Sequence, residues 1–254
     1  MRDKLKNKAY FDKMINTFNE SIETQLNWIE IGTTPQERIN YVKRGIVQDY
    51  ICLIQCKYSN NYDLNSLKED LQKCIKICNE SWDGFWNYNF NGKKLNQYTL
   101  SGYEEMLSLL SLSHLLNVLN EDFLKLVEVI DRDGVKDYLY EFIIRAKFKN
   151  REAILEESYQ TFFHVKHTFE KLRLAINETD KTKAEKLVQE FITKVWYTNH
   201  KEAGWYNSHK SKHDIYCGYW SFETAAVVKI MGLEDSSFID CQYYPKDLVL
   251  FETE

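Results

Sequence analysis

The chain of 254 residues is 44% hydrophobic and 15% aromatic, with 33 basic and 38 acidic residues, a composition typical of packed globular proteins and not of disordered ones. Its two prolines and nine glycines are too few for an all-β fold, which needs many tight turns. No apolar run reaches the roughly 18 residues that span a membrane, and the mixed-charge N-terminus lacks the apolar segment of a secretory signal. We therefore expect a cytoplasmic protein without a membrane partner.

The first third of the chain predicts three helices, because its apolar residues recur every three or four positions. The first helix is expected to end at Gly32. The motif Thr-Pro-Gln-Glu at 34–37 then predicts a capping box with Thr34 as N-cap, opening a second helix that runs to about Tyr58. A third helix follows the turn at residues 60–63.

The middle of the chain begins with an aperiodic stretch over residues 81–98, rich in aromatic residues, Asn and Gly, which indicates an ordered loop. A second capping box at 101–104 (Ser-Gly-Tyr-Glu) precedes a segment from Met106 to Leu119 that is apolar almost all round, as expected of a central, buried helix. Asp122 and then Asp131/Asp133 are predicted to start two shorter helices that end near residue 148.

A highly charged stretch at residues 147–152 is the best boundary between an N-terminal domain, residues 1–148, and a C-terminal domain, residues 149–254. Helices are expected at about 152–176 and 181–197, followed by an aromatic, His-rich loop over 199–216 and a helix that Ser221 caps and Gly232 ends. No strand and no repeat is predicted. The sequence thus indicates an all-α fold of about ten helices, packed as two subregions around a shared core.

The acidic residues are concentrated at the C-terminal end. Residues 231–254 contain six acids and one base, a local net charge of −5 that equals the net charge of the whole chain, and the first 230 residues are balanced with 32 acids and 32 bases. An acidic end on an otherwise balanced protein suggests a basic partner. A solvated surface is the alternative interpretation, and the acids after Gly232 could also cap a local turn.

Candidate catalytic and metal-binding patterns are weak. The chain has no Gly-rich phosphate loop, nucleophile elbow or paired-His zinc motif. His164/His167 and His209/His213 are spaced to share a helix face and could bind a metal, as could the cysteine pairs Cys52/Cys56 and Cys74/Cys78. We favour ordinary core and surface roles, and therefore expect no cofactor, no metal and no catalytic residue, with a metal-binding protein or enzyme as the alternative.

Two loops rich in Trp and Tyr, at 82–90 and 196–220, could form a small-ligand pocket or a partner surface, because these residue types dominate interface hot spots. Packing of the loops over helices is the competing interpretation. The sequence leaves both open.

Several motif blocks in chain order resemble the PoNi family of bacterial immunity proteins. The C-terminal blocks are Gly218–Phe238, beginning Gly-Tyr-Trp-Ser-Phe-Glu-Thr, and Tyr243–Val249. The N-terminal blocks include Arg38–Tyr50, Tyr103–Leu107 and Phe123–Asp133. Together they extend over nearly the entire chain, which makes the resemblance far more specific than any one block.

The resemblance implies an all-helical cytoplasmic protein without enzymatic activity. Such a protein would bind and neutralise a DNase toxin, a PoNe nuclease, that a competing or sibling cell delivers. It would not bind nucleic acid itself. A nuclease must attract phosphate and so tends to be basic, which fits the acidic end.

The family motif at Trp220, Ser221, Phe222 and Glu223 is expected to be scaffold, since members that recognise different toxins would share it. The candidate partner-binding residues are the acids and tyrosines that follow it: Glu234, Asp235, Asp240, Tyr243, Tyr244 and Asp247.

Overall fold

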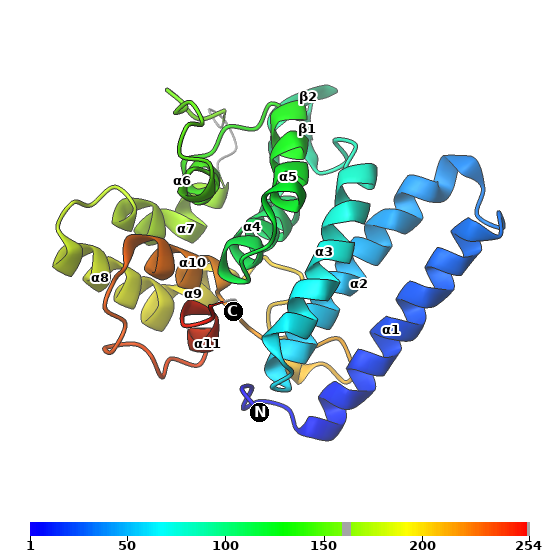
Figure 1. Cartoon of the computed structure of the whole chain (residues 1–254), viewed down its shortest axis with the longest axis horizontal. Helices are drawn as coiled ribbons and strands as arrows, with labels where there is room; N and C mark the ends of the chain where they lie inside the picture. Colours follow the sequence, from blue (N-terminus) through cyan, green and yellow to red (C-terminus); the bar gives the residue numbers. More distant parts are fainter. Residues whose placement is uncertain (159–163, 253–254) are drawn as a thin grey trace.

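The computed structural model describes residues 1–158 and 164–252, and for residues 164–166 the backbone only. Helices make up nearly all of its regular structure, which confirms the all-α prediction (Figure 1). The first six in chain order are α1 (Lys8–Glu30), α2 (Ile39–Ser59), α3 (Leu64–Ser81), α4 (Leu100–Leu115), α5 (Asn120–Arg132) and α6 (Tyr138–Lys147). Those that follow are α7 (His164–Ala175), α8 (Lys181–Glu190), α9 (Trp196–Asn199), α10 (Phe222–Met231) and α11 (Lys246–Val249).

Short irregular turns complete the helical elements. A 3₁₀ turn at Gln36–Arg38 precedes α2, a π-helical turn at Phe191–Val195 joins α8 to α9, and a second 3₁₀ turn lies at Ser208–Lys210. In the part of the chain that the structure describes, no helix is both long enough and apolar enough to cross a membrane.

Helix α4 lies at the centre of the molecule (Figure 1) and is buried over most of its surface, as its apolar composition predicts. It packs against α3 and α5 on the N-terminal side and against α6, α7 and α10 on the other. Phe222, Ala226 and other residues of α10 belong to the same core cluster as Leu109 and Leu112 of α4. One continuous core therefore joins the two halves of the chain.

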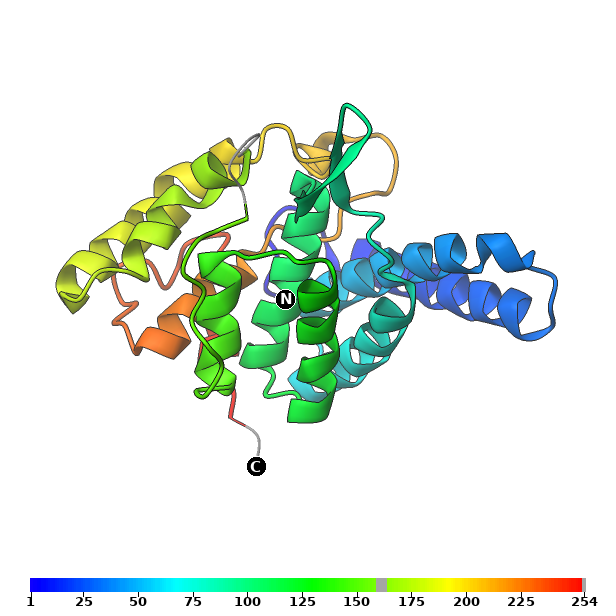
Figure 2. The ribbon, with the colours of Figure 1, turned by 90° about the horizontal axis from the view of Figure 1, so that it is seen from above.

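Helices α1 and α2 form a long antiparallel hairpin that extends away from this core on one side of the molecule (Figure 2). Ser21 and Gln25 of α1 both donate hydrogen bonds to Asp49 of α2, each at 2.8 Å. Gly45 lets the two helices approach closely, because a Cβ there would lie 3.1 Å from the Gln25 side chain.

The prediction of an aperiodic loop at residues 81–98 is wrong in one respect, because this stretch contains a hairpin of β1 (Asn87–Phe90) and β2 (Lys93–Tyr98). Asn91 and Gly92 both have positive φ, 49° and 76°, as a two-residue turn between antiparallel strands requires. The Asn-Gly pair at 91–92 is the feature of the sequence that indicates this hairpin turn. The strands themselves show no alternation of apolar residues, since burial is confined to their paired ends.

Several predicted helix starts are also wrong, although the helices exist. Thr99, not Ser101, caps α4, with its side chain accepting a hydrogen bond from Gly102 N at 3.3 Å. Asp137, not Asp131 or Asp133, caps α6 through bonds from two backbone N–H groups. Thr34 makes no capping bond, α5 begins at Asn120, and residues 152–158 are not helical.

Candidate functional site

The family motif at residues 220–223 clamps the end of α2 to the C-terminal half. Trp220 Nε1 donates to Ser59 Oγ at 2.8 Å, and its ring meets the Tyr58 ring edge-on with centroids 4.8 Å apart. Gly218 has φ +121°, and a Cβ there would lie 2.4 Å from Ser59 Oγ. Only glycine therefore allows the two segments to meet this closely.

Glu223 is a buried carboxyl group in the first turn of α10. Its Oε1 accepts hydrogen bonds from Trp196 Nε1 at 2.7 Å and from Ser221 Oγ at 2.6 Å. Burial raises the pKa of Glu223, although both bonds oppose the shift. Ser221 precedes α10 as predicted, but its hydroxyl bonds the side chains of Glu223 and Thr224 (2.6 Å) and not the helix backbone.

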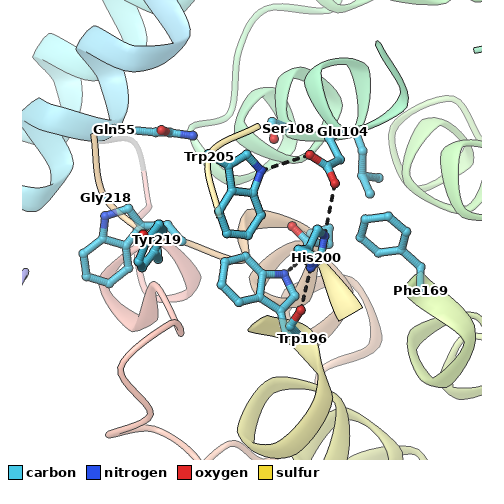
Figure 3. Close-up of a pocket in the computed structure, with 12 residues that line it drawn as sticks. Gln55, Glu104, Ser108, Phe169, Trp196, His200, Trp205, Gly218 and Tyr219 are labelled. Carbon is cyan, nitrogen blue, oxygen red and sulfur yellow. Dashed lines mark hydrogen bonds and ion pairs between the residues drawn. The ribbon is translucent and has the colours of Figure 1, made fainter. Parts of the chain in front are cut away.

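A small cavity between α4, α9 and the loop before α10 gathers several polar side chains (Figure 3). Trp205 Nε1 donates to Glu104 Oε2 at 3.0 Å, and His200 Nε2 lies 3.4 Å from Glu104 Oε1. His200 Nδ1 lies 2.5 Å from the carbonyl oxygen of Trp196. Sequence reasoning missed this group, because it treated Glu104 as part of a capping box.

These contacts define the protonation state of the cavity. A carbonyl oxygen can only accept, so Nδ1 of His200 carries the proton and a neutral ring leaves Nε2 as an acceptor. Burial lowers the pKa of His200 to about 4 and raises that of Glu104 to about 8. Near neutral pH these shifts favour a neutral His200 ring and a protonated Glu104 carboxyl.

The cavity has a volume of about 60 Å³, enough for a few water molecules and far below the roughly 300 Å³ of a typical small-molecule site. It adjoins a larger groove of about 350 Å³ between α2 and α4 that includes Gln48 and Glu105. Burial raises the pKa of Glu105 to about 7, against a hydrogen bond from Gln48 at 3.1 Å. Within the described residues Glu104 Oε1 is buried without a hydrogen-bond partner.

The aromatic loop at 196–220 is largely built into the core. Trp196 stacks on Trp205 with centroids 5.4 Å apart, and Tyr197 stacks on Tyr243 at 5.3 Å. The loop at 82–90 is divided, because Trp82 is buried whereas Phe85 is exposed.

The histidine pairs do not converge on a metal site in the described residues. The side chain of His164 lies outside them, and His167 is exposed. His209 Nδ1 lies 2.8 Å from Tyr219 OH, and His213 is exposed. All six cysteines are free thiols, and among the residues with described side chains no three His, Cys, Asp or Glu groups are arranged to hold a metal ion.

The predicted partner-binding acids of the C-terminal segment are mostly paired within the protein. Asp247 forms an ion pair with Arg2 at 2.5 Å. Asp235 accepts a hydrogen bond from Tyr244 OH at 2.9 Å, and Tyr244 itself is buried.

Asp240 and Glu234 are the more accessible acids of this segment. Asp240 lies 2.9 Å from Lys246 Nζ, with 86% of its side chain exposed. Glu234 is exposed and caps a local turn by accepting from Ser236 N at 3.2 Å. Tyr243 is half-buried against Trp196 and Tyr197. The six residues lie close in the chain, but their side chains do not form one open patch.

Comparison with known proteins gives matches to two family models and similarity to a solved structure. The model described as "PoNe immunity protein (PoNi), N-terminal" matches residues 2–128, and "PoNe immunity proteins (PoNi), C-terminal" matches residues 135–248. The crystal structure of protein PA2201 from Pseudomonas aeruginosa superposes with a TM-score of 0.66 at 14% sequence identity, covering 98% of this chain and 89% of that one. At this identity the similarity concerns the fold alone. No curated protein matches the chain.

Proposed function

Since the chain belongs to the PoNe immunity protein (PoNi) family, as the sequence resemblance indicated, we propose that it binds a cognate PoNe nuclease toxin and thereby prevents DNA cleavage. The observation that carries this proposal is the pair of family matches, which together extend from residue 2 to residue 248. Protection by binding requires no chemistry from the immunity protein. We place the protein in the cytoplasm, because the DNA to be protected lies there.

The charge of the chain supports a nuclease as partner. A nuclease domain must hold the phosphate backbone and is therefore basic around its DNA cleft. The immunity protein has a net charge of −5, which would accelerate encounter with such a surface. Exposed ion pairs contribute only about 0–1 kcal/mol each, so tight binding also needs buried apolar or aromatic contacts.

The C-terminal acids are proposed to act in steering, with Asp240 as the principal residue. Its side chain is 86% exposed, and its partner Lys246 is itself half-exposed. Asp240→Lys should therefore slow association with the toxin at low salt and leave the dissociation rate nearly unchanged. Charge reversal at Asp247 is a less clean test, because its ion pair with Arg2 is less exposed to solvent than the pair of Asp240 with Lys246. An unchanged association rate for Asp240→Lys would make these acids solvated surface only.

The proposed function is tested by co-expressing the full chain with the cognate nuclease domain in a bacterial host. We expect survival with intact chromosomal DNA, and co-elution of the two purified proteins in size-exclusion chromatography. Nuclease activity on plasmid DNA should fall in proportion to the immunity protein added. Continued killing by a toxin that forms no complex with the folded chain would overturn the proposal.

A further inference from the structure

The outer end of the α1–α2 hairpin carries a groove that is separate from the Glu104 cavity and from the C-terminal segment. It lies between α1, the start of α2 and the loop before β1, and has a volume of about 850 Å³. We call it the arm groove and define it by Glu20, Trp28, Tyr41, Arg44 and Phe85. Figure 2 shows that the hairpin extends beyond the rest of the molecule, so its end is open to a large partner.

Three aromatic side chains are exposed along the arm groove. Trp28 is 49% exposed, Tyr41 59% and Phe85 52%. The apolar surface continues at the tip of the hairpin, where Ile31 is 61% exposed. Contiguous exposed apolar surface is characteristic of binding sites, and Trp and Tyr are the side chains that most often dominate binding energy.

The same end of the hairpin is acidic. The 24 residues from Met14 to Glu37 contain four acids, Glu20, Glu23, Glu30 and Glu37, and no base. All four are exposed, and within the described part of the chain none of them forms an ion pair. This differs from the C-terminal segment, whose acids are mostly paired internally. Arg38 also lines the groove, with its guanidinium over the Tyr41 ring at 5.5 Å from the centroid, and the four unpaired acids outnumber this base.

The neighbouring bases of α2 are mostly occupied. Lys43 pairs with Glu80 at 2.7 Å, and Arg44 pairs with Asp83 at 3.0 Å. The Arg44 guanidinium also lies over the Phe85 ring, 4.2 Å from its centroid, which holds this exposed ring in place. A fixed aromatic surface loses little conformational entropy when a partner covers it.

We propose that the arm groove is the docking surface for the basic face of the nuclease domain, with Trp28 and Tyr41 as apolar anchors and the α1 glutamates paired with basic side chains of the toxin. This inference rests on the proposed function and adds where the toxin binds. A second copy of the chain is a poorer occupant, because two such acidic hairpins facing each other would repel.

The test uses the full chain and the purified nuclease domain, with binding rates measured at two salt concentrations. Trp28→Ala and Tyr41→Ala should each raise the dissociation rate at least tenfold with little change in association. Glu23→Lys combined with Glu30→Lys should lower the association rate severalfold at low salt, and this effect should shrink at high salt. All four positions are exposed, so circular dichroism and the melting temperature should stay as in the wild type.

Matched controls lie on α5, away from the arm groove: Leu124→Ala for the anchors and Glu121→Lys for the acids, both at exposed positions. They should bind the toxin as the wild type does. If the wild type binds and the arm variants bind equally well, the docking surface is elsewhere while the proposed function stands. If the wild type itself does not bind, the proposed function and the proposed docking surface are both wrong. If light scattering shows that Trp28→Ala dissolves a dimer without affecting toxin binding, the groove is a self-association surface and the inference is wrong.

Discussion

Glu104→Gln should make the stability of the protein less dependent on pH. Burial raises the pKa of Glu104 from an ordinary value of 4.5 to about 8, with smaller contributions from Glu223 and Glu105. The substitution preserves shape, and a glutamine can still accept from Trp205 Nε1 with its amide group beside His200 Nε2. Glu104→Gln therefore removes the titratable carboxyl group and little else.

The direction in which the unfolding free energy changes with pH depends on whether the folded or the unfolded state holds the Glu104 proton. Between these two pKa values the folded protein keeps a proton that the unfolded chain has released, so raising the pH favours unfolding. The contribution of Glu104 is fully present below the unfolded pKa and is lost as the pH rises through the folded one. From pH 5 to pH 8 the wild type should lose about 3 kcal/mol of unfolding free energy that Glu104→Gln keeps.

The assay is urea unfolding followed by tryptophan fluorescence at several pH values across that range. The quantity compared is the difference between variant and wild type, because titrating groups that do not interact with Glu104 cancel in it. Glu30→Gln on α1, at an exposed position, is the matched control for the replacement of a glutamate by glutamine. If the difference for Glu104→Gln is constant with pH, the carboxyl is ionised in the folded protein and the reasoning from burial is refuted.

Two further substitutions test the contacts that join the halves of the chain. Gly218→Ala should destabilise the protein by about 2–4 kcal/mol, because the new Cβ would collide with Ser59 Oγ and Trp220 Nε1 at a φ of +121°; a melting temperature equal to that of the wild type would contradict this. Arg173→Met should cost about 3–5 kcal/mol of unfolding free energy, since it leaves the fully buried Asp137 without the guanidinium now 2.7 Å away. Adding Asp137→Asn should recover part of this loss in chemical denaturation, and a double variant no more stable than the single one would argue against an uncompensated charge.

The wrongly predicted helix starts show that N-cap residues in the local sequence are not enough to locate the start of a helix. The residues around α4 and α6 include several good caps within a few positions, and the sequence alone does not rank them. Thr99 caps α4 through a bond from Gly102 N, and Gly102 itself packs against Trp86, where a Cβ would lie 2.6 Å from the Trp86 side chain. The cap that is used thus lies next to a contact with a neighbouring element, which the local sequence does not show.

The acidic C-terminal segment illustrates a different limit. The excess of acids there is evident from composition, but Asp247 meets a base 245 positions away in Arg2. The four acids near the end of α1 were less conspicuous, because bases elsewhere in the first 230 residues balance them. Counting charges along the chain gives their number, but it does not show which of them form ion pairs in the folded protein.

The sequence by itself determined the all-α class, the central buried helix and the family, because helical periodicity and motif order are properties of neighbouring residues. Only the tertiary structure decided that Glu104 is largely buried beside His200 and that Asp247 forms an ion pair with Arg2. It also decided that Trp28 stays exposed. Burial and charge pairing depend on residues far apart in the chain, and the folded core is what brings those residues together.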